Sequence, residues 1–238
     1  MVFSSMIFLY GFLPLHILAY FAFKKQTYRD AVLLISSMIF YAWGEPVWIS
    51  LLLFSGLTDY VHGLIVEKYR GAWQSKAALI SSIVLNLFIL GFFKYSAFLI
   101  QNVNALLQVN LPYREFALPI GISFYTFQTM SYVIDVYRGE VPAQKSPWKF
   151  LLYVSLFHQL VAGPIVRYSD IAHDIEHRHL SISRFSEGIT RFVLGLSKKV
   201  ILANTAGEIS ELLLQGDIQE LPVLGAWFGI SLFALLIY

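Results

Sequence analysis

The chain has 238 residues, of which 57% are hydrophobic and 13% charged, and its formal net charge is +2. Soluble domains average about 25% charged residues. With so few charges and a mean hydropathy of +0.64, this chain has more apolar surface than a single soluble core can bury. The lack of cysteine excludes disulfides, thiolate metal sites and cysteine nucleophiles. The small net charge gives no argument for nucleic-acid binding. We therefore expect an all-α membrane protein.

The first apolar segment, residues 6–23, precedes the first basic side chains, Lys24, Lys25 and Arg29. A cleaved signal peptide places its positive charge before the apolar stretch. The segment is therefore expected to stay in the protein as a first membrane span.

Eight apolar segments follow one another along the chain. A bilayer core about 30 Å thick is crossed by about 20 helical residues. We expect a polytopic transmembrane helical bundle with about seven or eight such segments, one of them re-entrant. They are residues 6–23, 31–43, 47–66, 77–93, 116–136, 150–166, 185–203 and 221–238. The second is short for a span, and residues 96–107 are expected to form an interfacial helix.

Basic residues predict which loops face the cytoplasm. Residues 24–29, 68–76 and 138–149 are assigned there by their lysines and arginines. The alternation fails after Lys149, because basic residues also follow the segment 150–166. A hairpin bent at Gly163-Pro164 would return the chain to the cytoplasm, and such irregular backbone must be enclosed by protein or line a wet cavity. We therefore predict that residues 167–184 are cytoplasmic.

The stretch "LPIGISFYTFQTMSYVIDVYRG" places polar residues at spacings of four, three, four and three, which is one face of a helix. They are Gly121, Tyr125, Gln128, Tyr132 and Asp135. A polar stripe within a bilayer is expected to face the bundle interior or a wet cavity. The alternative role is hydrogen bonding between helices, worth about 0.6 kcal/mol per bond. For Asp135 the alternative is an ion pair with Arg138.

Two further polar candidates lie in apolar segments. Asp59 and His62, three residues apart, could form a proton relay or cation site, or a structural pair. His158 needs a purpose or a firm partner in a membrane segment, and its neighbours Gln159 and Tyr153 could supply hydrogen bonds. The alternative is a packing histidine whose hydrogen bonds are satisfied.

Basic residues at seven-residue spacing, Arg184, Arg191 and Lys198, share one helix face. Together with Lys199 and Arg167 they are candidates for binding the phosphates of an acyl donor or carrier, or those of lipids. The stretch "HDIEH" at 173–177 matches a zinc-protease pattern, but no third ligand is evident and we expect no metal. Asp170, Asp174 and Glu176 are interpreted as part of a solvated loop.

Four stretches together resemble one family: "MVFSSMIFLYGFLPL", the long stretch quoted above, "LFHQLVAGPIVRYSDI" and "RFSEGITRFVLGLSKKV". They are similar to the amino-terminal half of a membrane-bound O-acyltransferase of the alginate O-acetyltransferase type, with the D-alanyl-lipoteichoic acid exporter as a relative. The resemblance implies that residues 1–238 are the amino-terminal part of a single transmembrane domain in the bacterial inner membrane. It also implies acyl transfer from a cytoplasmic donor, acetyl-CoA or an acyl carrier, to hydroxyls of an exported polysaccharide such as alginate.

The resemblance further implies membrane lipid and extracytoplasmic transfer proteins as partners, and no bound cofactor. The family's catalytic histidine is expected in a motif like "RRWHISL" after a polar stretch like "FDFSGYSDMAIG", and neither occurs in this sequence. We therefore assign no catalytic residue and expect a chain cut in mid-protein. The alternatives are a transporter or channel and an inactive membrane fragment.

Overall fold

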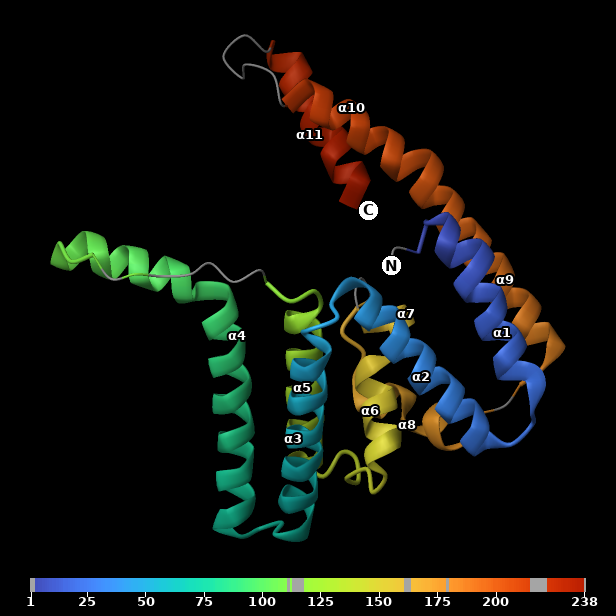
Figure 1. Cartoon of the computed structure of the whole chain (residues 1–238), viewed down its shortest axis with the longest axis vertical. Coiled ribbons are helices and arrows are strands. Elements are labelled where there is room, and N and C mark those ends of the chain that lie inside the picture. Colours follow the sequence, from blue (N-terminus) through green and yellow to red (C-terminus); the bar gives the residue numbers. More distant parts are fainter. Residues whose placement is uncertain are drawn as a thin grey trace. The chain divides into compact units, whose positions relative to one another are not determined.

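The computed structural model describes residues 3–110, 112, 118–160, 164–178, 180–214 and 222–237 (Figure 1). Across these residues the secondary structure is helical and contains no strand, which confirms the all-α class. The chain divides into two compact units. The first comprises mainly Ile7–Arg178, and the second comprises Val2–Met6 with His179–Tyr238.

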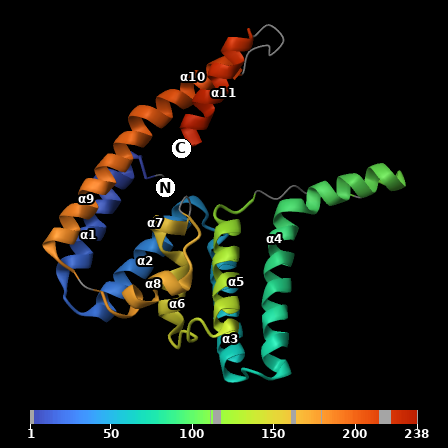
Figure 2. The same cartoon turned by 180° about the vertical axis from the view of Figure 1, so that it is seen from behind.

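Helices make up nearly all of the first unit. In chain order they are η1 (Ile7–Phe12, a π-helix), α1 (Leu13–Ala22), α2 (Gln26–Gly44), α3 (Ile49–Lys68), α4 (Trp73–Leu107), α5 (Ile122–Arg138), α6 (Pro147–Ser155), α7 (Phe157–Leu160) and α8 (Tyr168–Glu176). The second unit contains α9 (Ile182–Ser197), η2 (Lys198–Ala203, a π-helix), α10 (Asn204–Leu214) and α11 (Val223–Ile237). In this unit α10 and α11 pack against each other (Figure 2).

The centre of the first unit is the three-helix group α3, α4 and α5, in which each helix packs against the other two. Gly63 of α3 lets α5 approach closely, because a Cβ there would lie 2.7 Å from the ring of Tyr132. Helix α5 starts after Gly121, whose φ of +80° suits glycine. The predicted start at residue 116 was therefore wrong for the described part: Leu118 and Pro119 precede the helix, and helical structure begins at Ile122.

Helix α4 is longer than the sequence pattern indicated. It has 35 residues and joins the predicted segments 77–93 and 96–107 without a break. Figure 1 shows that α4 bends, so that its later part forms an arm at an angle to the earlier part. The expected helix at 96–107 is therefore present, as a continuation of the preceding helix. The short segment 31–43 is likewise extended, within the 19 residues of α2.

The predicted segment 150–166 is broken, but earlier than expected. Helix α6 ends at Ser155, Leu156 takes an extended ψ of 113°, and α7 begins at Phe157. The backbone N–H of Phe157 donates a 3.2 Å hydrogen bond to the buried Ser37 hydroxyl of α2. Protein thus encloses this irregular backbone, as required where a helix breaks inside a membrane. Gly163 lies outside the described residues, and the re-entrant path stays a prediction.

The interpretation of residues 170–176 as a solvated loop was wrong. Asp170, Asp174 and Glu176 belong to α8, which packs against α5 and α6. Burial of Tyr168 and Ile175 on one side of α8 supplies the apolar contact that stabilises so short a helix.

Two described helices, α3 and α4, are long and apolar enough to cross a bilayer, and Ile7–Ala22 and Val223–Ile237 are shorter apolar helices. Helix α4 exposes large apolar side chains, Val84 at 60% and Phe88 at 68%, while it buries Ser82 and Asn86. This reversal of the soluble pattern fits a membrane helical protein. The expected number of seven or eight spans stays a prediction.

Candidate functional site

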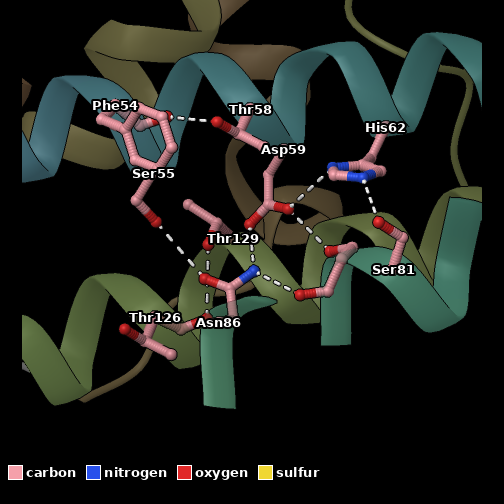
Figure 3. Close-up of polar contacts among 10 residues, drawn as sticks. Phe54, Ser55, Thr58, Asp59, His62, Ser81, Asn86, Thr126 and Thr129 are labelled. Carbon is pink, nitrogen blue, oxygen red and sulfur yellow. Dashed lines mark hydrogen bonds and ion pairs between the residues drawn. The ribbon is translucent and has the colours of Figure 1, made fainter. Parts of the chain in front are cut away.

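A polar cluster with a buried centre joins α3 to α4 around Asp59, which is 0% exposed (Figure 3). The Ser82 hydroxyl donates a 2.6 Å hydrogen bond to Oδ1 of Asp59. The Asn86 amide donates a 2.7 Å hydrogen bond to Oδ2. Helix α4 presents Ser82 and Asn86 on one face because they are four residues apart. Both carboxylate oxygens therefore have a donor, which is the arrangement that a buried carboxylate requires.

The cluster extends in two directions. On one side lies His62, whose Nδ1 is 3.6 Å from Oδ1 of Asp59. Its Nε2 is 3.2 Å from the hydroxyl of Ser81, and Ser81 is exposed. On the other side Ser55 donates a 3.3 Å hydrogen bond to the Asn86 side-chain oxygen. Figure 3 shows Thr126 and Thr129 of α5 close to Asn86. The predicted inward placement of Asp59 and His62 is thus found, and the contacts favour the structural pair over an open relay.

The polar stripe of α5 faces the interior of the first unit, since all four of its large polar side chains are buried. They are Tyr125, Gln128, Tyr132 and Asp135. Gln128 donates a 3.1 Å hydrogen bond to the Tyr153 carbonyl, and the Tyr132 hydroxyl accepts one of 3.0 Å from the Gln144 N–H. The Tyr125 hydroxyl and Asp135 Oδ2 have no hydrogen-bond partner among the described residues. The stripe therefore joins helices in part, and any further role of its residues stays a prediction.

The alternative partner for Asp135 was wrong. Arg138 lies 3.8 Å from Glu140 instead, in an exposed pair. Glu140 follows the end of α5 at Gly139, where the chain turns back with φ of +81°.

His158, an interior candidate, follows the break at Leu156 and lies in the short helix α7, where the residue retains solvent-accessible surface. Neither expected neighbour bonds to it: Gln159 donates a 2.8 Å hydrogen bond to the Tyr153 carbonyl, and the Tyr153 hydroxyl donates one of 3.0 Å to the Val166 carbonyl. The His158 ring instead lies edge-on to Phe157, with the centroids 5.4 Å apart. Any role of His158 in the interior stays a prediction.

Sequence reasoning missed a second polar network, centred on Gln144. The Gln144 side chain donates 2.9 Å hydrogen bonds to the Tyr168 hydroxyl and to Oε1 of Glu176. Lys149 forms an ion pair with Glu176, and these hydrogen bonds lower the pKa of Glu176. Burial raises the pKa of Tyr168. The network fixes the connection between α5 and α6 onto α8. Its members come from separate segments, so no sequence spacing could have shown it.

The basic donor-binding candidates lie in both units. Arg184 and Arg191 on α9 and Lys198 and Lys199 on η2 are exposed, and Arg167 belongs to the first unit. Arg191 pairs with Glu187 at 2.5 Å, and Lys199 donates a 3.1 Å hydrogen bond to the Asn204 side-chain oxygen. An exposed ion pair leaves most of the charge available to other anions. Their role in binding a donor stays a prediction.

The helical class, the apolar exterior and the enclosed polar interior agree with the class of membrane-bound acyltransferase that the sequence resembles. No family model matches the chain, and no solved structure matches it. Curated relatives do match. The chain is 38% identical over 219 residues to the probable alginate O-acetylase AlgI of Pseudomonas aeruginosa, an alignment covering 89% of this chain and 41% of that protein.

Two more relatives extend this finding. The AlgI protein of Pseudomonas syringae pv. tomato is also 38% identical, with 89% of this chain and 42% of that protein covered. The peptidoglycan O-acetyltransferase of Helicobacter pylori is 27% identical, with 89% of this chain and 46% of that protein covered. The resemblance to the alginate O-acetylase type is thus confirmed over most of the chain, and the chain spans about two-fifths of the length of these relatives.

Proposed function

We propose that this chain is part of a membrane O-acetyltransferase that transfers acetyl groups to hydroxyls of an exported polysaccharide. The observation that carries the proposal is the 38% identity to an alginate O-acetylase across 89% of the chain. The apolar exterior of α4 supports a membrane location, and we propose a multi-pass protein of the bacterial inner membrane. Alginate is the proposed acceptor because five relatives carry that name.

Acetylation of a hydroxyl requires a base close to the acceptor oxygen and an anion-binding surface for a charged donor. Asp59 is 0% exposed and bonded to donors on α4, so an acceptor hydroxyl has no access to it in this structure. We therefore propose that this chain supplies the scaffold and the donor side. The donor would be cytoplasmic acetyl-CoA or an acyl carrier, bound by Arg184, Arg191, Lys198 and Lys199 of the second unit, with Arg167 of the first unit as a separate candidate. Extracytoplasmic partner proteins would complete the transfer.

Deleting the gene in its host tests the proposed activity. Secreted polysaccharide from wild-type, deleted and complemented cells is compared by NMR for acetyl methyl groups and by release of acetate in base. We expect acetylation to fall in the deletion and to return on complementation, with the amount of polymer unchanged. Full acetylation in the deleted strain would reject the proposal.

The transport alternative receives no support from the Asp59 cluster. Ionisable groups of an ion pathway face a water-filled cavity. Asp59 is instead 0% exposed and bonded to donors on α4. Flux of ions or sugars into proteoliposomes without any acyl donor would nevertheless favour transport over transfer.

A further inference from the structure

A pocket of about 380 Å³ lies at the turn between α3 and α4. Two cationic side chains, Arg70 and Lys76, line it together with the aromatic rings of Trp73 and Tyr137. No carboxylate is among its described lining residues. The pocket is therefore suited to a negatively charged ligand.

A neutral contact holds Arg70, one of the two cations of this pocket. Arg70 Nη2 donates a 3.0 Å hydrogen bond to the Val136 carbonyl at the end of α5. Its guanidinium lies beside Gly139, where an added Cβ would be 3.3 Å from Nη1. Within the described part of the chain, neither Arg70 nor Lys76 has a carboxylate oxygen within 4.0 Å. The Arg70 guanidinium is thus positioned while its charge remains uncompensated.

The pocket lies where α3 ends and α4 begins, and these two helices are long and apolar enough to cross a bilayer. Trp73 is 75% exposed, and Tyr69 and Tyr137 are each 39% exposed. Trp and Tyr side chains concentrate at the level of lipid headgroups. Further along α4, Ile80, Val84 and Phe88 are exposed and apolar. A ligand with a phosphate head and acyl chains would match both surfaces.

We propose that this pocket binds the phosphate headgroup of an anionic phospholipid, whose acyl chains lie along the exposed apolar face of α4. The adjacent apolar face selects a lipid over a soluble phosphate compound. Each basic residue at a membrane surface contributes about 1 kcal/mol to binding of anionic lipid. Arg70 and Lys76 together should therefore raise affinity by about thirty-fold. The site is independent of acetyl transfer, so its test needs no acyl donor.

Lipid retained by the purified full chain measures this binding. Protein in neutral detergent is mixed with phosphatidylglycerol or phosphatidylcholine, washed, and analysed by native mass spectrometry. We expect selective retention of phosphatidylglycerol, reduced by at least about ten-fold in the double variant Arg70→Gln, Lys76→Gln. The matched control is Lys24→Gln, Lys25→Gln, which removes two exposed charges from another loop with the same predicted cytoplasmic side.

The single variant Lys76→Gln separates loss of lipid binding from loss of folding, because the Lys76 side chain makes no hydrogen bond within the described residues. It should retain the wild-type melting temperature and still lose part of the lipid. Equal retention by the pocket and control variants would overturn the proposal. It would also be overturned if glycerol phosphate displaced the lipid at matched concentration, since a soluble phosphate compound would then be the ligand.

Discussion

The hydrogen bonds around Asp59 predict that replacing this residue lowers the stability of the protein. Replacing it with Ala leaves the Ser82 hydroxyl and one N–H of the Asn86 amide buried without an acceptor, while the Asn86 bond of 2.9 Å to the Ser82 carbonyl remains. Each unpaired buried donor costs about 1–3 kcal/mol. We expect Asp59→Ala to lower the melting temperature in detergent clearly and Asp59→Asn to lower it less, because the amide oxygen still accepts one bond. Asp174→Ala is the control, since that side chain is 78% exposed. Equal melting temperatures for Asp59→Ala and Asp174→Ala would contradict the role assigned to Asp59.

The carboxyl group of Glu176 should make the stability of the protein depend on pH. Hydrogen bonds from Lys149 and Gln144 lower its pKa below the ordinary 4.5, so the ionised form stabilises the folded state. This stabilisation is complete above about pH 4.5 and is lost as the pH falls through the lowered pKa. Because the side chain is 40% exposed, the effect is at most about 1 kcal/mol.

The melting temperature of Glu176→Gln should therefore be below that of the wild type at neutral pH, with the difference shrinking in acid. Glu140→Gln is the control, because Glu140 pairs only loosely with Arg138 at 3.8 Å. A difference for Glu176→Gln that grows on acidification would show that the sign is wrong.

Close packing of α3 on α5 depends on Gly63. A Cβ there would lie 2.7 Å from atoms of the fully buried Tyr132 ring, so the ring or the helix must shift. Forced overpacking costs about 1–3 kcal/mol. We expect Gly63→Ala to destabilise the protein, while Gly91→Ala in α4, with no atom within 4 Å of the added Cβ, should be neutral or slightly stabilising. Thermal unfolding of the two variants in one detergent compares them, and a stable Gly63→Ala would refute the close approach.

The basic residues of α9 and η2 test the donor side of the proposed function. In the full-length protein, replacing Arg184, Arg191 and Lys198 with Gln should raise the KM for the acyl donor more than it reduces membrane insertion. The physical reason is that these exposed charges attract anionic phosphates. Replacing the exposed Lys24, Lys25 and Lys94 with Gln removes the same charge elsewhere. Equal loss of donor use and insertion in the first variant would leave only a role in lipid anchoring.

Sequence pattern predicted helices and faces better than it predicted their ends and partners. The spacing from Tyr125 to Asp135 indicated one buried face because a helix repeats every 3.6 residues. The break at Leu156 had no such signal, because it is stabilised by Ser37, far away in the chain. The partners of Gln144 also come from distant segments. Local periodicity carries no information on contacts of this kind.

Across the described residues, many large apolar side chains are exposed while several polar side chains are buried beside the apolar core. Ser55, Asp59, Ser82 and Asn86 are buried, whereas large side chains such as Leu106 and Trp73 are mostly exposed. A soluble protein rarely exposes wide apolar patches, because the exposed surface promotes association. Lipid around the helices removes that cost and leaves hydrogen bonds between helices to hold buried polar groups. The same distribution explains why composition alone predicted the membrane class.

This distribution predicts that one substitution costs little if the helix faces water and much if it faces lipid. Val84 is 60% exposed and lies near the middle of the predicted span at 77–93. In water, Lys at such a surface position would change stability by no more than about 0.5 kcal/mol. At the centre of a spanning helix it should cost about 2.5–3.5 kcal/mol of insertion free energy. We therefore expect Val84→Lys to lower the fraction of protein that resists extraction from membranes by alkaline carbonate. Leu106→Lys is the control, since Leu106 is 81% exposed in the later part of α4, within the expected interfacial segment, where its charge can reach water. If both variants resist extraction equally, lipid does not surround the first part of α4.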